Sequence, residues 1–319
     1  MRQESATAQG SGSGRSRAGH RPGWFRIGTV EPYLYLLPAM LAVVVWIYRP
    51  LAQTVKLSFY QWNLLPTSPQ IPVGFTNYHD VLTVPGMQQA LLNTLVYVVG
   101  LLPFSVLFPL AVAIVVDGVR GRLRDLYRTA LFTPLLMAPI VVSIIWSWLL
   151  DPTTGVVNMA FHAAVGMAPV DWLGNTATAL WAIVMITGWK IFGFSLLIFS
   201  AGLTNLDRTY YEAASVDGAG RVACIRWITL PLLVPTILFM IMMSLLLSAQ
   251  WTFPLINSLT QGGPLFATTN VYYLLYQIGF QDFSIGYSAA ASLMFFVAFG
   301  ALALLFLWLS DRFSFHDAS

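Results

Sequence analysis

The chain has 319 residues, of which 57% are hydrophobic and only 9% are charged, and its formal net charge is +3. Soluble domains carry about 25% charged residues, so this composition excludes a soluble globular protein and indicates an integral membrane protein. The single cysteine, Cys224, excludes an internal disulfide, and none of the four histidines has a neighbour at metal-ligand spacing. We therefore expect no metal site.

Residues 1–28 are mainly Gly, Ser and Arg, with little apolar content before Trp24. Such a segment cannot bury enough apolar surface to fold, so we predict a disordered tail. The first apolar run that follows is long and lacks a convincing small-residue cleavage pattern, which argues against a secretory signal.

Six apolar segments are long enough to cross a bilayer core of about 30 Å as helices. They run approximately over residues 33–56, 90–116, 129–150, 177–201, 231–253 and 285–310. Prolines such as Pro134 and Pro139 interrupt several of them, and neighbouring groups must then satisfy the freed carbonyls. The predicted fold class is therefore all-α, a polytopic membrane protein with six kinked and packed transmembrane helices.

The positions of the basic residues predict the orientation. Thirteen of the sixteen fall on one side of the predicted spans: Arg2, Arg15, Arg17, Arg21, Arg26, Arg120, Arg122, Arg124, Arg128, Arg208, Arg221, Arg226 and Arg312. Because basic residues accumulate on the cytoplasmic side, we expect both termini and the 202–230 loop to face the cytoplasm, in a protein of the cell membrane. The outer connections are then residues 57–89, 151–176 and 254–284. They contain a predicted surface helix over 156–165, a turn at Gln261–Pro264 and a short helix over 268–280.

A polar, small-residue insert separates the fourth and fifth spans and begins EAASVDGAG at Glu212. Asp207 or Asn205 can cap a helix there, Gly218 weakens it, and Pro231 suits the first turn of the next apolar run. This pattern predicts a helix–turn–helix that docks into the groove of a partner.

The insert resembles the EAA loop of the permease subunits of binding-protein-dependent ABC importers. The matching positions are Glu212, Ala213, Ala214, Asp217, Gly218, Ala219, Leu230 and Pro231. The resemblance implies a type I importer permease fold, with residues 29–319 as its transmembrane domain and 205–230 as the loop that couples to a separate ATPase. It also implies a second homologous permease, two ATPase subunits and an extracytoplasmic solute-binding protein as partners. Leu206–Asp207 departs from the Ile-Pro pair usual before this loop.

Three further stretches are similar to the sugar-type branch of that family: SFYQW from Ser58, Trp189–Lys190, and the GGP-x-x-ATT run from Gly262. This branch includes glycerol-3-phosphate, glycerophosphodiester and disaccharide permeases. The resemblance implies a hydrophilic sugar-like or glycerol-phosphate-type solute.

The chain itself has no ATP site by motif. A phosphate-binding loop requires G-x-x-x-x-G-K-[ST], and neither Lys56, after Val55, nor Lys190, after Trp189, fits it. We therefore expect no catalytic residue and no cofactor on this chain, with ATP and Mg on the partner ATPase.

Lys190 lies near mid-depth of the fourth span, where a cation costs about 2.5–3.5 kcal/mol. It either lines a solute path, or bonds carbonyls freed by a neighbouring kink or an acid of the partner permease. The other candidates for the solute path are Asn93, Gln250, Trp251 and Asn257. Hydrogen-bonding groups beside aromatic faces suit a sugar, although polar residues and tryptophans also serve packing in membrane proteins.

Two other classes of protein are less favoured. A membrane-embedded enzyme needs paired catalytic groups, and an ion-coupled secondary carrier needs an intramembrane acid or a broken-helix ion site. The predicted spans carry no acid beyond their ends, which argues against both.

Overall fold

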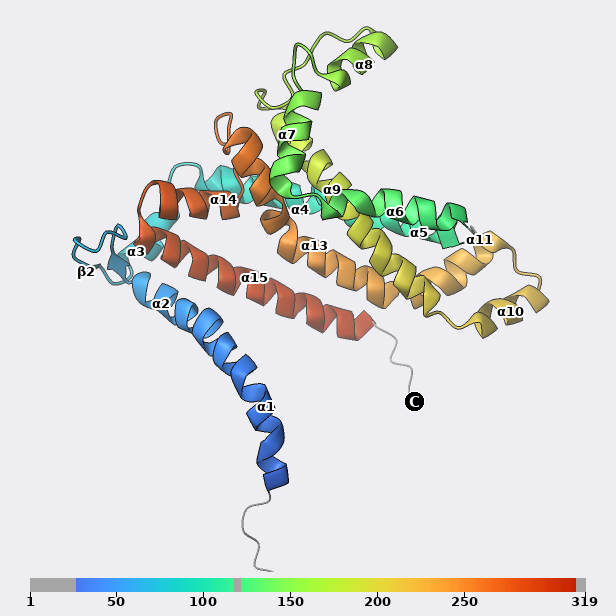
Figure 1. Cartoon of the computed structure of the whole chain (residues 1–319), viewed down its shortest axis with the longest axis horizontal. Helices are drawn as coiled ribbons and strands as arrows, with labels where there is room; N and C mark the ends of the chain where they lie inside the picture. The colour runs from blue at the N-terminus through green and yellow to red at the C-terminus, as the bar shows by residue number, and fades with distance from the viewer. Residues whose placement is uncertain (1–26, 118–121, 314–319) are drawn as a thin grey trace, which may run out of the picture. The chain divides into compact units, whose positions relative to one another are not determined.

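The structure is a computed structural model that describes residues 27–117 and 122–313, most of which are helical (Figure 1). In chain order the helices are α1 (Ile27–Val43), η1 (Val44–Tyr48), α2 (Arg49–Leu57), α3 (Thr76–Val81), α4 (Met87–Leu102), η2 (Pro103–Leu107), α5 (Phe108–Asp117), α6 (Arg122–Leu136), α7 (Pro139–Leu149), α8 (Val156–Val165), α9 (Ala179–Thr204), α10 (Arg208–Val216), α11 (Arg221–Cys224), η3 (Ile225–Thr229), α12 (Leu230–Leu232), α13 (Val234–Leu255), η4 (Ile256–Thr260), α14 (Val271–Tyr276), η5 (Gln277–Gln281) and α15 (Ile285–Phe313). The elements labelled η are π-helical turns. A hairpin of β1 (Tyr60–Gln61) and β2 (Ile71–Pro72) is the one sheet of the described residues. The all-α prediction is confirmed.

The chain divides into two units, residues 1–52 and residues 53–319. The predicted tail over 1–26 and Arg120 lie outside the described residues, as do the side chains of Arg122, Arg124, Arg128 and Arg312. Ile27 and Gly28, which the sequence pattern assigns to the tail, already form the start of α1.

Five helical stretches of the described chain are long and apolar enough to cross a membrane: Tyr33–Leu57, Met87–Val116, Ala179–Thr204, Val234–Thr260 and Ile285–Trp308. The stretch expected to be the third span consists instead of two helices, Thr129–Leu136 and Pro139–Leu149, that meet at a bend of 105°. The described chain has six spans when this bent pair is counted as one.

The bend lies at Pro139, while Pro134 is accommodated inside α6. The residue before a proline is disfavoured in the helical region, and Ala138 is extended, with φ −62° and ψ 139°. Pro139 then occupies the first turn of α7, where an N–H would have no partner within that helix. Both prolines were expected to interrupt the span from the sequence, but in the structure only Pro139 lies at the break.

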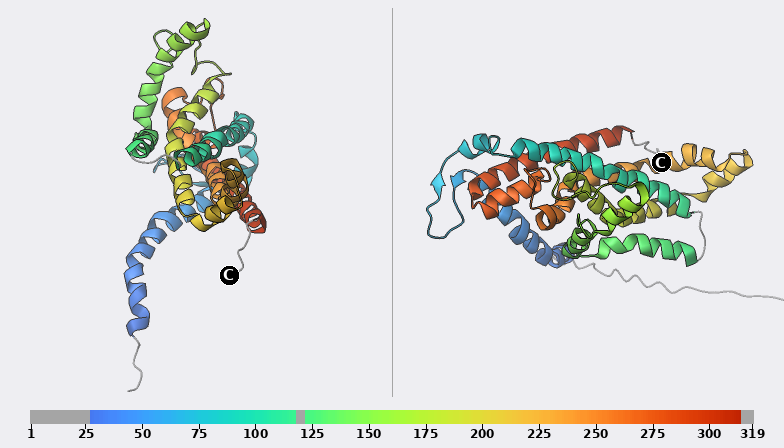
Figure 2. Two further views of the ribbon diagram at one scale, coloured as in Figure 1. Left: turned by 90° about the vertical axis from the view of Figure 1, so that its right-hand side faces the viewer. Right: turned by 90° about the horizontal axis from the view of Figure 1, so that it is seen from above.

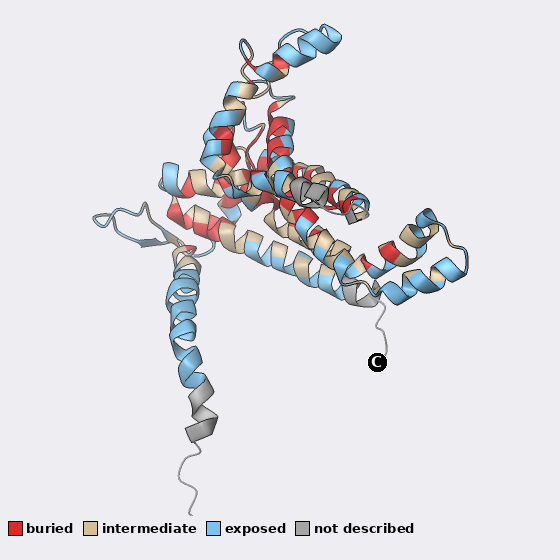
Figure 3. Ribbon diagram, turned by 45° about the vertical axis from the view of Figure 1, so that its right-hand side comes forward, coloured by how far each residue is buried: buried red, intermediate tan, exposed pale blue. Residues whose placement is uncertain are grey.

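Helix α9 is the centre of the second unit. In its most apolar stretch 61% of the residues are buried, against 33% in Met87–Val116. It packs against α4, α5, α6 and α13, and in Figure 3 the buried residues concentrate where the helices of the second unit pack together. Ile183 and Ile186 of α9 form one core cluster with Tyr97 of α4, Leu255 of α13 and Tyr273 of α14.

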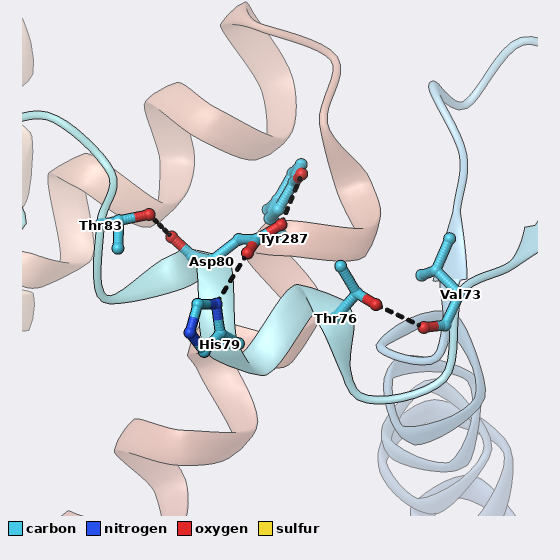
Figure 4. A network of polar contacts seen from close by, with 6 residues as sticks. All are labelled: Val73, Thr76, His79, Asp80, Thr83 and Tyr287. Atoms are coloured by element: carbon cyan, nitrogen blue, oxygen red, sulfur yellow. Dashed lines mark hydrogen bonds and ion pairs between the residues drawn. The ribbon is translucent and has the colours of Figure 1, made fainter.

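At one end of the second unit, hydrogen bonds made by side chains of α3 connect this helix to its neighbours. Asn77 of α3 donates from Nδ2 to the carbonyls of Ser58, at 2.8 Å, and Tyr60, at 3.1 Å. Asp80 of α3 accepts a bond from the Tyr287 hydroxyl of α15 and one at 3.0 Å from Nδ1 of His79 (Figure 4). These contacts join α3 and the β1–β2 hairpin to the start of α15. At the other end, α10 and α11 project beyond α9 and α13 (Figures 1 and 2).

Candidate functional site

A cavity of about 1130 Å³ lies in the second unit, among α9, α13, α14, α15 and the α6–α7 bend. Most of its lining is apolar, including Phe194, Leu247 and Phe295. Cavities of this kind, with a few polar groups in an apolar wall, are typical of small-molecule sites. The polar groups therefore decide what the cavity can hold.

Three of the candidates predicted for the solute path line this cavity together: Lys190 of α9, and Gln250 and Trp251 of α13. Lys190 is the one charged side chain among the lining residues that the structure describes. Thr187, one turn before Lys190, also lines the cavity and was not predicted from the sequence. Its hydroxyl oxygen is buried and has no hydrogen-bond partner among the described residues. A threonine in an apolar span often only packs against a neighbouring helix, so the sequence does not indicate that Thr187 lines a cavity.

Lys190 also bonds the α6–α7 bend, at a distance of 3.2 Å between Nζ and the Leu135 carbonyl oxygen. In a continuous helix that carbonyl would accept from the N–H of residue 139, which is a proline and has none. An unsatisfied backbone group within a bilayer costs several kcal/mol, and a mid-span cation carries its own cost. One contact offsets both. The geometry thus combines two of the alternatives left open by the sequence, since Lys190 lines the cavity and bonds a freed carbonyl.

Asn93 and Asn257 do not line the cavity. The Asn93 side chain is buried, and its Nδ2 donates to the carbonyls of Phe266 and Thr269, both at 2.8 Å. Its Oδ1 accepts from Nε2 of Gln89. Asn257 is half-buried in η4, outside the lining. The structure therefore separates these two residues from Lys190, Gln250 and Trp251.

Asn93 belongs to a set of contacts that hold the loop between η4 and α14. The Tyr97 hydroxyl donates to the Thr268 carbonyl at 3.0 Å, and Thr94 Oγ1 accepts from the Val271 N–H at 3.0 Å. Asn270 is fully buried, caps α14 by accepting from the Tyr273 N–H, and donates to the Ala249 carbonyl of α13. The loop is therefore bonded to α4 on one side and α13 on the other. Sequence reasoning found its turn but not the polar residues that anchor it.

The second candidate site is the segment α10–α11, which has the predicted helix–turn–helix form. Asp207 caps α10, because its carboxylate accepts from the Thr209 N–H at 2.9 Å. That hydrogen bond lowers the pKa of Asp207 from its usual range. Gly218 has φ +76° and follows the C-cap of α10. The Ala219 N–H reaches the Ala214 carbonyl at 2.9 Å, and the Gly218 N–H reaches that of Ser215 at 3.2 Å.

The residues matched to the EAA loop lie together on this segment. Glu212, Ala213, Asp217 and Gly218 are exposed, Ala214 and Ala219 are half-buried, and Leu230 and Pro231 begin the helix that leads into α13. The Glu212 carboxylate makes no hydrogen bond or ion pair with the described part of the chain. Large apolar side chains of the segment are also exposed, Val216 to 87%, Val222 to 78% and Trp227 to 71%, beside exposed charged residues such as Asp217 and Arg221. The Tyr211 hydroxyl of α10 and Thr229 Oγ1 of η3, 2.9 Å apart, join α10 to the π-helical turn that follows α11.

These two sites, a mid-span cavity and a projecting helical turn, define a membrane transport subunit. A family model described as "Binding-protein-dependent transport system inner membrane component" matches residues 84–315, and the chain belongs to this family. It is thus a multi-pass permease subunit of an ABC importer.

Relatives match this chain over most of its length. The sn-glycerol-3-phosphate transport system permease protein UgpA of Pectobacterium atrosepticum is 29% identical, covering 82% of this chain and 88% of that protein. The probable ABC transporter permease protein YesP of Bacillus subtilis is 32% identical, covering 86% and 88%. A chain from the crystal structure of a bacterial ABC transporter involved in the import of the acidic polysaccharide alginate matches with a TM-score of 0.78. At 24% identity, and with coverage of 89% of this chain and 98% of that chain, this likeness shows the shared type I permease fold.

Proposed function

We propose that this chain is the permease through which an ATP-driven importer carries a hydrophilic sugar-like or glycerol-phosphate-type solute into the cell. The cavity that brings Lys190, Gln250 and Trp251 together at mid-span carries this proposal. An ammonium group, an amide and an indole can hold phosphate or hydroxyl oxygens beside a flat sugar face. The named function of the UgpA relatives supports the same class of solute.

Transport would follow alternating access, with the cavity open to one side of the membrane at a time. The partners would be a second homologous permease, two ATPase subunits and an extracytoplasmic solute-binding protein. A solved relative of this fold was crystallised with an alginate pentasaccharide-bound periplasmic protein, which supports the last of these. Both termini and the α10–α11 segment would face the cytoplasm.

The α10–α11 segment would receive the mechanical work of the ATPase, which holds ATP and Mg. Exposed large apolar residues such as Val222 and Trp227 on a short helical segment are typical of a surface that a partner covers. Glu212 would pair with a basic group of the ATPase, and Ala213 and Ala214 would allow close approach of its backbone.

The coupling role is tested by Glu212→Ala in the assembled importer reconstituted in proteoliposomes. We expect the variant to insert and assemble but to lose solute uptake and solute-stimulated ATP hydrolysis, because one charge pair is removed. Glu212→Gln, which keeps the shape and removes only the charge, should show a similar loss. If uptake and stimulated hydrolysis both survive these changes, this segment does not couple the subunits.

The class of solute is tested on the solute-binding protein that co-purifies with the importer. Calorimetric titration with a disaccharide, glycerol 3-phosphate and a glycerophosphodiester should find one that binds tightly. Tight binding of an amino acid or a metal ion instead would overturn the assignment to sugar-type solutes, while leaving the permease role intact.

A further inference from the structure

The break in the third span leaves the carbonyl of Leu135, in the last turn of α6, without its regular helical donor. Its regular donor would be the N–H of residue 139, which Pro139 lacks, and the 105° bend carries α7 away from the axis of α6. Carbonyls at a helix end require a side chain, water or a ligand as donor. In this structure a side chain meets that need.

Lys190 supplies that donor from a different span. Its Nζ lies 3.2 Å from the Leu135 oxygen, although the two residues are 55 positions apart in the sequence. Leu135 and Pro139 both line the cavity, next to Lys190 itself. The same ammonium group therefore lies at the bend and at the wall that the bend creates.

The register between α6 and α9 holds Lys190 against Leu135. Gly193, one turn after Lys190, lies so close to α6 that an added Cβ would meet the Leu131 carbonyl oxygen and approach the Cα of Phe132 to 2.8 Å. Leu131 is one turn before Leu135. The two helices thus run antiparallel in close contact, with Gly193 facing Leu131 and Lys190 facing Leu135.

We propose that Lys190 is a positioning residue: its ammonium replaces the hydrogen bond that Pro139 cannot make and holds the α6–α7 bend that shapes the cavity wall. This role acts on a solute through the wall and does not depend on which solute the importer carries. It also explains a cation in an otherwise apolar span without requiring an anionic solute.

The bend can be measured directly with two spin labels, in the full chain within its assembled importer and without solute. Ala130 of α6 and Trp148 of α7 are both exposed and lie on either side of the bend. With both replaced by cysteine in a Cys224→Ser background, an unbroken helix would separate the two backbone positions by about 27 Å. The bent pair should give a shorter and narrow distance distribution by pulsed electron paramagnetic resonance.

Lys190→Met should broaden this distribution and shift it toward longer distances, whereas Lys190→Arg, which keeps the donors, should restore it. The matched control is Lys56→Met, because Lys56 is the other lysine of the sequence, is exposed and lies over the Tyr60 ring, 5.7 Å from its centroid. That change should leave the distribution as it is.

A double-mutant cycle connects the effect to the missing N–H. Pro139→Ala restores a donor at position 139, so Lys190→Met should have a smaller effect in that background than in the parent. The proposal is overturned if Lys190→Met leaves the distribution unchanged, or if its effect is the same with alanine at position 139. An unchanged distribution with weakened solute uptake would assign Lys190 to direct solute contact alone.

Discussion

The shape of the α10–α11 turn depends on one residue, Gly218. Its φ of +76° lies in the left-handed region, and its hydrogen bond to Ser215, together with that of Ala219 to Ala214, forms the Schellman motif that ends α10. No side chain or backbone atom would obstruct an added Cβ there, so the backbone conformation and not space requires glycine.

Gly218→Val should therefore distort the turn while leaving the membrane spans intact. Holding an L-residue in the left-handed region costs roughly 1–2 kcal/mol, and a β-branched residue should lie at the upper end. We expect normal insertion but loss of solute-stimulated ATP hydrolysis in the assembled importer. Gly220→Ala is the matched control, because Gly220 has φ −74° and open space around it. Equal activity of the two variants would show that the turn does not have to keep this shape.

Asp207 gives the same segment a dependence on pH. The backbone N–H of Thr209, and then its hydroxyl, stabilise the ionised carboxylate and lower the pKa of Asp207. A depressed pKa in the folded state means that the cap stabilises α10 above the unfolded pKa of about 3.9 and is lost as pH falls through the folded value. Amide hydrogen exchange of Thr209 should therefore accelerate, relative to intrinsic rates, on acidification in that range. In Asp207→Asn, which still caps but does not titrate, this acceleration should disappear.

At the scale of elements, the loop between η4 and α14 is held by α4. Asn93 donates to two of its carbonyls and Tyr97 donates to a third, that of Thr268. Thr94 accepts from the N–H of Val271, where α14 begins. Because the groups involved are buried, each one left unsatisfied costs about 1–3 kcal/mol. The backbone amides of the loop should therefore exchange slowly with solvent.

Asn93→Ala should release this loop. We expect a loss of stability of about 2–4 kcal/mol from the two unpaired carbonyls, and faster hydrogen exchange over residues 266–271 measured by mass spectrometry. Gln89→Ala removes only the exposed partner of the Asn93 oxygen and should leave exchange in the loop nearly unchanged. Similar exchange in both variants would argue that the loop is held by packing alone.

The helices were predictable from the sequence, because a run of apolar residues longer than a bilayer leaves the backbone no alternative. The surface helix α8 also formed over its expected residues. The bend at Pro139 was not predictable, since Pro134 offers the same local chemistry and stays inside α6. The roles of Asn93 and Thr187 depend on which side of a helix faces which neighbour, and an apolar span with few polar residues gives little periodicity from which to infer that.

At the scale of the whole molecule, the EAA residues identified the family because they are close in sequence and need no folding information. The cavity depends on how α9, α13, α14 and α15 pack, and the sequence predicted only some of its lining residues. Lys190, Gln250 and Trp251 could be proposed as lining residues because polar groups are rare in the spans. Asn93 is also a polar residue of a span, but its side chain bonds the loop between η4 and α14 and does not line the cavity.

The orientation of the molecule can be tested with introduced cysteines, because only Cys224 has to be replaced first. In a Cys224→Ser background, a cysteine at Val216 of α10 should react with a membrane-impermeant maleimide only after the membrane is permeabilised. A cysteine at Thr67, in the exposed loop between β1 and β2, should react in intact spheroplasts. These outcomes follow from the distribution of arginines. Labelling of position 216 from outside would reverse the predicted topology and remove any contact with a cytoplasmic ATPase.

Helix α9 has one more consequence for how the subunit can move. It contains no proline, it carries Lys190 about 21 Å from Thr204, and only residues 205–207 separate it from α10. Any tilt imposed on α10 should therefore travel along α9 without a kink to absorb it. The backbones of α6 and α9 lie so close at Gly193 that an added Cβ would meet the Leu131 carbonyl oxygen. They should swing as one piece, so that the cavity changes volume only by displacement of this pair against α13, α14 and α15.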